Sequence, residues 1–301
     1  MDWKSSIRGF TSYLKLEKSL SENSVVAYES DIDKLRLFSQ NELGDTVPNK
    51  ITMENIQLFL KRINDVELAA STQSRILSGL KSFFKYLVLE DVISESPADL
   101  IEAPKLGRKL PDTLSIHEIH QLIDAIDLSH PQGMRNKAML EVLYSCGLRV
   151  SELVNLKISG LYFDDGFIRV IGKGDKERLV PVGKTAIKFI RIYLDDIRVQ
   201  QSIQDGYEDF VFLNRRGKGL TRVMIFTIIK DLALVAGLKK NISPHTFRHS
   251  FASHMVEAGA DLRAVQEMLG HESITTTEIY THLDRDYLRQ EILEHHPRNK
   301  T

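Results

Sequence analysis

The chain has little cysteine, no long apolar run and almost no net charge. Cys146 is the one cysteine among 301 residues, so no internal disulfide can form, as is usual in a reducing compartment. No run of about 18 apolar residues exists, and no apolar segment follows residues 1–6, so we expect neither a membrane span nor a secretory signal. These absences favour a cytoplasmic protein.

The charge balance gives no sign of a nucleic-acid-binding protein. The formal net charge is −1, whereas a pI above about 9 is typical of such proteins. Residues 1–105 hold 13 basic against 16 acidic residues, and residues 106–301 hold 27 against 25. Neither half is basic as a whole. A DNA-binding surface on this chain must therefore be a local patch that acidic surface balances elsewhere.

The first hundred residues are predicted to be helical. Apolar side chains recur at helical spacing in four segments, near residues 10–16, 24–40, 52–63 and from 71 onward. Thr52, followed by Asn55, is a candidate N-cap for the third segment. Four amphipathic helices with short polar connections predict a small orthogonal bundle.

Three prolines and a basic stretch follow this bundle. Pro97, Pro104 and Pro111 interrupt the helical pattern, and the basic residues lie between the last two. We place the domain boundary there, with a helical domain over residues 1–102, a linker over 103–112 and a second domain over 113–301. The linker is either a solvated loop or a strap that lies against DNA phosphates.

The second domain is predicted to be mainly helical with one β-hairpin. Residues 167–171 are apolar and β-branched, residues 172–176 have turn composition, and residues 178–182 resume a strand. Helices are predicted over residues 115–128, 135–145, 184–201, 221–236, 246–258, 262–269 and 286–295. The predicted fold class is mainly α with a small β-sheet, in which an N-terminal helical bundle precedes an α+β domain.

Two candidate functional residues lie close to glycines. Arg149 follows Gly147, which can end a helix, and is either a surface arginine paired with Glu152 or part of a functional site. Lys173 lies between two glycines at the tip of the predicted hairpin. It is either a solvated turn lysine or an ammonium group that a close backbone approach delivers to a ligand.

A second group of candidates lies nearer the C-terminus. A Ser-Pro pair marks a helix start, after which His245 and Arg248 lie one turn apart on the same side. A helix N-terminus offers free N–H groups and a partial positive charge, so this pair predicts an anion site. His271 follows a Leu-Gly helix-stop signal, and Tyr280 lies nine residues further on. Taken alone, such a tyrosine is usually a core or interface aromatic.

The histidines do not form a recognisable metal motif. The candidate ligands are His245, His249, His254 and His271, with Cys146 as a fifth. His245 and His249 have the i, i+4 spacing of a chelating pair, but no glutamate follows His245 as in the zincin motif and no CxxC pair accompanies them. We therefore expect no metal and no cofactor, and we expect His249 to pack or bond locally.

Taken together, these stretches resemble the tyrosine recombinases of the phage integrase family, and within it the bacterial Xer type. The helical first hundred residues are similar to the family's SAM-like core-binding domain, and the ending His295-His296-Pro297-Arg298 resembles Xer tails, most of all those of XerD-like members. The other matching segments occur in the family's order over roughly the last half of the chain. They are Gly147-Leu148-Arg149-Val150-Ser151-Glu152-Leu153, Ile171-Gly172-Lys173-Gly174, His245-Thr246-Phe247-Arg248-His249-Ser250-Phe251-Ala252, Leu269-Gly270-His271 and Ile279-Tyr280-Thr281-His282.

The resemblance implies a set of six catalytic residues, which are Arg149, Lys173, His245, Arg248, His271 and Tyr280. Tyr280 would attack the DNA backbone to form an O-(3′-phospho-DNA)-tyrosine, while the two arginines grip the phosphate. Lys173 would protonate the leaving 5′-oxygen, and His271 would donate a hydrogen bond. His245 either shares the proton transfer or donates to a phosphate oxygen. Glu152 would orient an arginine from outside the reacting groups.

The resemblance also implies double-stranded DNA as the substrate and a tetramer assembled on it. The other protomers are further copies or a paralogous XerC-like recombinase, and an FtsK-like septal DNA translocase is a further candidate partner. The implied function is the resolution of chromosome dimers at a dif-like site. Alternatives are an integrase or transposase of a mobile element, a DNA-relaxing enzyme of the same fold, and a non-catalytic DNA-binding protein, against which the intact set of six argues. The tail helix packs on its own domain or docks on a neighbouring protomer.

Overall fold

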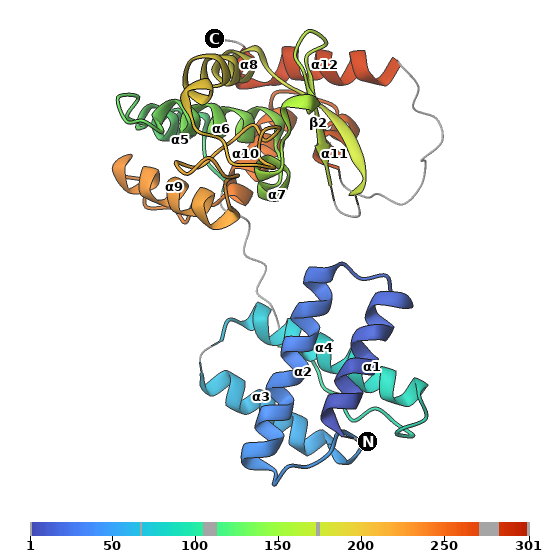
Figure 1. Cartoon of the computed structure of the whole chain (residues 1–301). Helices are drawn as coiled ribbons and strands as arrows, with labels where there is room; N and C mark the ends of the chain where they lie inside the picture. The colour runs from blue at the N-terminus through green and yellow to red at the C-terminus, as the bar shows by residue number, and fades with distance from the viewer. Residues whose placement is uncertain (1, 67, 105–112, 173–174, 271–282, 300–301) are drawn as a thin grey trace. The chain divides into compact units, whose positions relative to one another are not determined.

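The computed structural model describes residues 2–66, 68–104, 113–172, 175–270 and 283–299 (Figure 1). The chain divides into two compact units, residues 1–109 and 110–301, which are described separately below. Most of the predicted linker, residues 105–112, lies outside the described residues.

The part of the N-terminal unit that the structure describes is a bundle of four helices, as predicted. The helices are α1 (Trp3–Leu16), α2 (Glu22–Glu42), α3 (Met53–Asp65) and α4 (Ala70–Leu89), and a 3-10 turn spans Pro48–Lys50. Aromatic rings fill much of the core, where the ring centroids of Phe10 and Phe83 lie 5.3 Å apart edge to face. Thr52 caps α3 as predicted, since its hydroxyl accepts from the Asn55 N–H while the Asn55 side chain accepts from the Thr52 N–H.

The described part of the C-terminal unit packs helices together with a small sheet, so the predicted fold class is confirmed. The sheet consists of β1 (Leu161–Tyr162), β2 (Phe167–Ile171) and β3 (Glu177–Pro181). The helices are α5 (Ile116–Asp124), α6 (Gly133–Cys146), α7 (Val150–Val154), α8 (Lys184–Ile192), α9 (Arg222–Val235), α10 (Pro244–Glu257), α11 (Leu262–Leu269) and α12 (Leu283–His295). Short 3-10 turns span Ile158–Gly160, Arg198–Gln200 and Pro297–Asn299.

Several predicted element boundaries were wrong. The helix predicted over residues 184–201 ends at Ile192, after which the chain forms a π turn over Tyr193–Ile197 and then a 3-10 turn. The helix predicted over 115–128 ends at Asp124, and the short strand β1 and the short helix α7 had no counterpart among the predicted elements. The π turn, the 3-10 turn, β1 and α7 each contain too few residues to show a periodic pattern in the sequence.

The sheet is antiparallel in the order β1-β2-β3, and its register decides which side chains face the core. Ile168 pairs with Val180 and Val170 pairs with Arg178. Side chains of directly paired residues lie on the same face, so Arg178 shares a face with the buried Val170 and Val180. An arginine therefore occupies an inward-facing position of β3.

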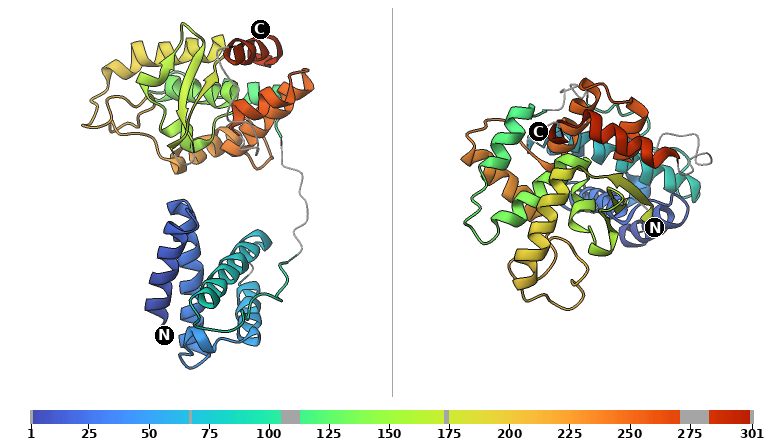
Figure 2. Two further views of the ribbon diagram at one scale, coloured as in Figure 1. Left: turned by 90° about the vertical axis from the view of Figure 1, so that its right-hand side faces the viewer. Right: turned by 90° about the horizontal axis from the view of Figure 1, so that it is seen from above.

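Helix α6 is the centre of the C-terminal unit. Every residue from Ala138 to Cys146 is buried, as is typical of a helix surrounded by other elements. Helices α8 and α10 pack on α6, and α12 packs against β3 and α11 (Figures 1 and 2). No described helix is both long and apolar enough to cross a membrane.

Candidate active site

Gly147 ends α6 and sets the position of Arg149. Its φ of +56° is in the left-handed region, and a Cβ atom there would lie 2.5 Å from Cδ1 of Phe251. Only glycine fits this turn without displacing the phenyl ring. Arg149 follows two residues later as the N-cap of α7, so the chain reverses just before the arginine.

The carboxylate of Glu152 lies behind Arg149 and binds it twice. Oε2 of Glu152 accepts from the backbone N–H of Arg149 at 2.8 Å, and Oε1 accepts from Nη1 of Arg149 at 2.9 Å. Glu152 is 2% exposed, and this burial acts to raise the pKa of its carboxyl group. Hydrogen bonds from Arg178 and Arg149 outweigh the burial and lower the pKa, so Glu152 is an anion at neutral pH.

Arg178 of β3 is a second cation on the same carboxylate, and it was not among the predicted site residues. Its Nη1 and Nη2 donate to the two oxygens of Glu152 at 2.7 and 2.9 Å in a bidentate fork. Its Nε donates to the carbonyl of Met268 at 3.2 Å. The signal for it was present, because Arg178 alternates with Val180 and Val182 at positions where a half-buried strand places apolar residues.

Arg248 approaches the same region from α10. Nη1 donates to the carbonyl of Gly147 at 2.8 Å, and Nη2 donates to the carbonyl of Leu269. The side chain is largely buried, and burial together with the positive charge of Arg149 lowers the pKa of Arg248 to about 10. Arg248 therefore remains a cation at neutral pH, although close to another guanidinium.

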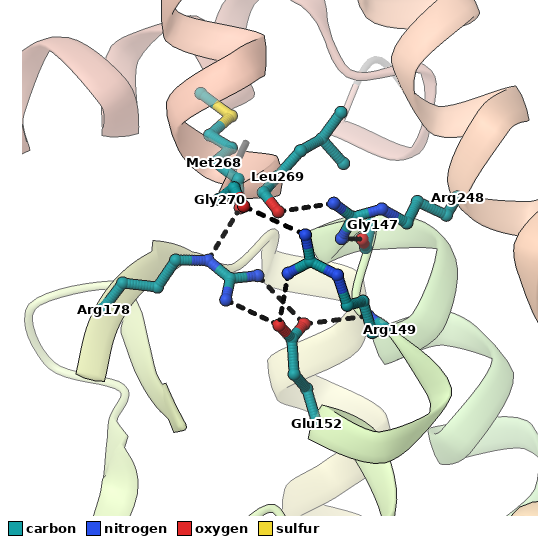
Figure 3. A network of polar contacts seen from close by, with 8 residues as sticks. All are labelled: Gly147, Arg149, Glu152, Arg178, Arg248, Met268, Leu269 and Gly270. Atoms are coloured by element: carbon teal, nitrogen blue, oxygen red, sulfur yellow. Dashed lines mark hydrogen bonds and ion pairs between the residues drawn. The ribbon is translucent and has the colours of Figure 1, made fainter. Parts of the chain in front are cut away.

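The carboxyl end of α11 holds all three arginines (Figure 3). The carbonyls of Met268, Leu269 and Gly270 accept from Arg178, Arg248 and Arg149 respectively. The last carbonyls of a helix have no partner within it and carry a partial negative charge, so they are natural acceptors for guanidinium groups. The described cluster thus holds three guanidinium groups and one carboxylate, which binds two of them, and it has an excess of positive charge.

His245 lies in the first turn of α10, one turn before Arg248. Ser243 and Thr246 form the capping box of this helix, and Pro244 occupies its first position. The imidazole is exposed, but partial burial, followed by the charges of His249, Arg248 and Arg149, lowers its pKa. A neutral imidazole is therefore favoured near pH 7, and a neutral imidazole can accept a proton.

The structure describes three of the six predicted catalytic residues and places two of them at the same end of α11, with the third in the first turn of α10. Arg149 and Arg248 contact the same end of α11, and His245 is close enough to both that their charges act on its pKa. The remaining predicted residues, Lys173, His271 and Tyr280, lie outside the described residues. Lys173 directly follows Gly172, where the Gly172 N–H donates to the carbonyl of Lys176 at 2.8 Å and closes the base of the hairpin.

The described residues contain no cluster suited to a metal ion. No group of three or more histidine, cysteine, aspartate or glutamate side chains is placed to share a metal within the described ranges. His254 is buried, and its Nδ1 is hydrogen-bonded to the hydroxyl of Tyr144 at 2.8 Å. Cys146 is fully buried, which raises the pKa of its thiol to about 12 and keeps it protonated. His249 is exposed.

Comparison with known proteins agrees with this architecture. The model described as "Phage integrase family" matches residues 112–286, and the model described as "Phage integrase, N-terminal SAM-like domain" matches residues 7–91. The chain is 44% identical to Tyrosine recombinase XerD of Chlorobaculum tepidum over 299 residues, which cover 98% of this chain and 97% of that protein. It is 42% identical to Tyrosine recombinase XerD of Listeria monocytogenes over 292 residues, which cover 97% and 98%.

Solved structures show the same fold. The XerH recombinase bound to a palindromic difH substrate is 27% identical with a TM-score of 0.67, and the match covers 89% of this chain and 79% of that chain. A lambda integrase dimer bound to a core site is 20% identical with a TM-score of 0.71, over 93% and 100% of the two chains. The predicted resemblance is confirmed: this chain belongs to the phage integrase family and is a tyrosine recombinase, an enzyme of site-specific DNA recombination.

Proposed function

We propose that this recombinase cuts and rejoins double-stranded DNA through a 3′-phosphotyrosyl intermediate on Tyr280. The observation that carries the proposal is the pair of guanidinium groups, Arg149 and Arg248, fixed at the end of α11 beside a neutral His245. The XerH neighbour was solved with its DNA substrate before and after cleavage, which supports DNA as the substrate of this chain too.

The arginines are proposed to hold the scissile phosphate. A phosphodiester is an anion and repels a phenolate, so its charge must be screened before attack. Two guanidinium groups can each bind phosphate oxygens in a fork, and they remain charged at neutral pH. Their contacts strengthen as negative charge builds on the phosphoryl oxygens in the transition state, which lowers the barrier to reaction.

The chemical step forms one bond and breaks one. The phenol oxygen of Tyr280 attacks phosphorus and its proton passes to the neutral imidazole of His245, whose lowered pKa supports this role. The bond between phosphorus and the 5′-oxygen breaks, and Lys173 gives that oxygen a proton. His271 donates a hydrogen bond to the phosphate. The energy of the broken bond is kept in the phosphotyrosyl link, so a second 5′-hydroxyl can reseal the strand without ATP, a metal or another cofactor.

The cellular role is proposed from the relatives. Two proteins named XerD match nearly the whole chain, and the XerH neighbour carries a difH substrate. We assign residues 1–102 to a DNA-binding core domain, 103–112 to the linker and 113–301 to the catalytic domain with its tail helix. Four protomers act together on DNA, either copies of this chain or copies with a XerC-like paralogue. They resolve chromosome dimers at a dif-like site in the cytoplasm, and an FtsK-like septal translocase is the proposed partner there.

A nicked suicide substrate tests the chemistry. A duplex carrying the host chromosome's dif-like site, nicked so that the cut fragment diffuses away, traps the enzyme on DNA and gives a slower band in denaturing electrophoresis. The adduct is expected with the native protein and is expected to vanish in Tyr280→Phe. Tyr287→Phe is the matched control, because Tyr287 is an exposed tyrosine seven residues further on, in α12. Native protein that binds this duplex but yields no adduct would refute the proposal.

A further inference from the structure

We propose that Arg178 is a positioning residue for cleavage, which offsets the charge of Glu152 so that Arg149 keeps its attraction for the phosphate. The inference rests on the proposed function, because it needs Arg149 to bind the scissile phosphate. It concerns a residue of β3 that binds neither DNA nor the nucleophile in this scheme.

The hydrogen bonds of Arg178 point into the protein. All three of its nitrogens donate to protein acceptors, which are the two oxygens of Glu152 and the carbonyl of Met268. Its side chain is 17% exposed, whereas that of Arg149 is 36% exposed. Arg178 therefore faces the carboxylate, and Arg149 is the guanidinium that remains open to a ligand.

Glu152 is saturated only when both arginines are present. A carboxylate offers about four acceptor positions. Oε1 accepts from Nη1 of Arg149 and Nη1 of Arg178, and Oε2 accepts from the backbone N–H of Arg149 and Nη2 of Arg178. Without Arg178, two acceptor positions of a buried anion would be empty, and the carboxylate could turn away from the geometry that fixes Arg149.

The charge balance gives Arg178 a second effect. Arg149 and Glu152 alone form a neutral pair, and a neutral pair has little attraction for a phosphate. Arg178 restores one positive charge where the low dielectric of a buried site strengthens every interaction. It thus allows a buried carboxylate to orient Arg149 without cancelling it.

Arg178 also lies beside the base of the hairpin. An added Cβ at Gly172 would lie 3.6 Å from Nη1 of Arg178 and 3.8 Å from Oε1 of Glu152, and Gly172 precedes Lys173 in the sequence. A rival explanation follows, in which Arg178 acts on the proton donor through the hairpin. A second rival is that the ion pair stabilises the fold alone, although buried pairs are weak evidence for stability.

The first experiment compares two substrates. Arg178→Gln is expected to slow adduct formation on the nicked phosphodiester by about 10- to 100-fold, as is common for residues that orient a ligand-binding group. On a methylphosphonate substrate, in which a methyl group replaces one charged oxygen, the defect relative to the native enzyme is expected to shrink. Charge screening matters less when the phosphate is neutral. An equal reduction of the rates on the two substrates, which a loss of folded enzyme would cause, would overturn the proposal.

Two further measurements separate the rivals. A 5′-bridging phosphorothiolate leaves without protonation, so rescue of Arg178→Gln on that substrate would show that Arg178 acts through the proton donor and would overturn the proposal. In a double-variant cycle, Arg178→Gln is expected to slow cleavage less in a Glu152→Gln background, because no charge then needs offsetting. Equal effects in both backgrounds would contradict it.

Arg169→Gln is the matched control. Arg169 is on the neighbouring strand β2, faces the other side of the sheet and pairs with the exposed Glu177 at 3.4 Å. Its replacement is expected to leave the cleavage rate unchanged on every substrate. Native enzyme that forms the adduct while Arg178→Gln cleaves at the native rate would refute this inference alone. Native enzyme without adduct would refute the proposed function instead.

Discussion

The described part of the C-terminal unit buries two carboxylates, and the two differ in what surrounds them. Glu152 is held by Arg149 and Arg178 in the cluster at the end of α11. Glu141, on α6, is fully buried and is held by Arg298 from the end of the chain. Arg178 and Arg298 each reach their carboxylate from a distant part of the sequence, yet of the two carboxylates only Glu152 borders the candidate active site.

The second region, which we term the C-terminal anchor, consists of Glu141, Tyr144, His254, His296 and Arg298. His296 is fully buried and its ring packs against Tyr144, with centroids 4.8 Å apart. Its Nε2 donates to the carbonyl of Tyr144 at 3.3 Å, and its Nδ1 accepts from the backbone N–H of Arg298 at 3.2 Å. These contacts fix the chain just after α12 to the central helix α6.

The difference lies in the balance of charge and exposure. In the anchor the guanidinium of Arg298 pairs with the carboxylate of Glu141 and both side chains are largely buried, so the pair is neutral and has little contact with solvent. In the cluster two guanidinium groups bind one carboxylate, a third binds the neighbouring carbonyls of Gly147 and Leu269, and Arg149 is about one-third exposed (Figure 3). The same pairing therefore fastens the chain in one place and leaves a positively charged surface in the other.

The largest effect is expected from a substitution in the charged cluster at the candidate active site. Arg149→Gln is expected to slow adduct formation by about 10²- to 10³-fold, the usual cost of removing one donor to a charged transition state. The free energy of unfolding is expected to change by less than about 1 kcal/mol, because Arg149 is partly exposed and Glu152 keeps the fork from Arg178. Cleavage of the nicked duplex and urea unfolding measure the two quantities.

A stability loss as large as the catalytic loss would count against this contrast. It would show that Arg149 is mainly a structural residue. The single tryptophan, Trp3, provides a check, because it is buried in the N-terminal unit and reports on that unit alone. In Arg149→Gln, the urea concentration at the midpoint of the Trp3 fluorescence transition is expected to equal that of the native protein.

The next effect breaks the anchor. Arg298→Gln leaves Glu141 as a buried carboxylate without its cation, and the C-terminal unit is expected to lose about 3 kcal/mol of unfolding free energy. The Glu141→Gln, Arg298→Gln double variant is expected to recover part of the loss, since no buried charge is then unpaired. Far-UV circular dichroism in urea follows the helices of both units, and Trp3 fluorescence identifies the transition of the N-terminal unit. A double variant less stable than the single variant would contradict this account.

The sequence predicted the parts of the molecule that depend on local patterns. The four N-terminal helices follow from the spacing of buried residues such as Phe10 and Leu35, and strand β2 has the predicted bounds because its apolar run is flanked by turn residues. Gly147 marked the position of Arg149, since a left-handed turn is a local property that only glycine satisfies easily.

Contacts between distant residues could not be predicted in the same way. Arg178 reaches Glu152 across 26 positions, and Arg298 reaches Glu141 across 157. Which arginine meets which carboxylate depends on the packing of β3 and α6, and no periodic pattern records it. A single clue existed for Arg178, a charge at an inward strand position, and none existed for His296, which counted only as part of the ending that resembles Xer tails.

The smallest expected effect uses pH to act on the anchor alone. Burial lowers the pKa of His296 to about 3, against 6.5 for a free side chain, and the neutral ring already uses both nitrogens. Below pH 6.5 the imidazole of His296 therefore binds a proton in the unfolded chain but not in the folded chain, so the free energy of unfolding falls as the pH falls. Between pH 7 and pH 5 the expected loss from this residue is about 2 kcal/mol. His296→Gln is expected to flatten the dependence measured by urea unfolding, whereas His117→Gln, at an exposed position of α5, is expected to retain the native slope. Equal slopes in His296→Gln and the native chain would show that the ring is not held neutral. The anchor would then no longer differ from the charged cluster in being neutral.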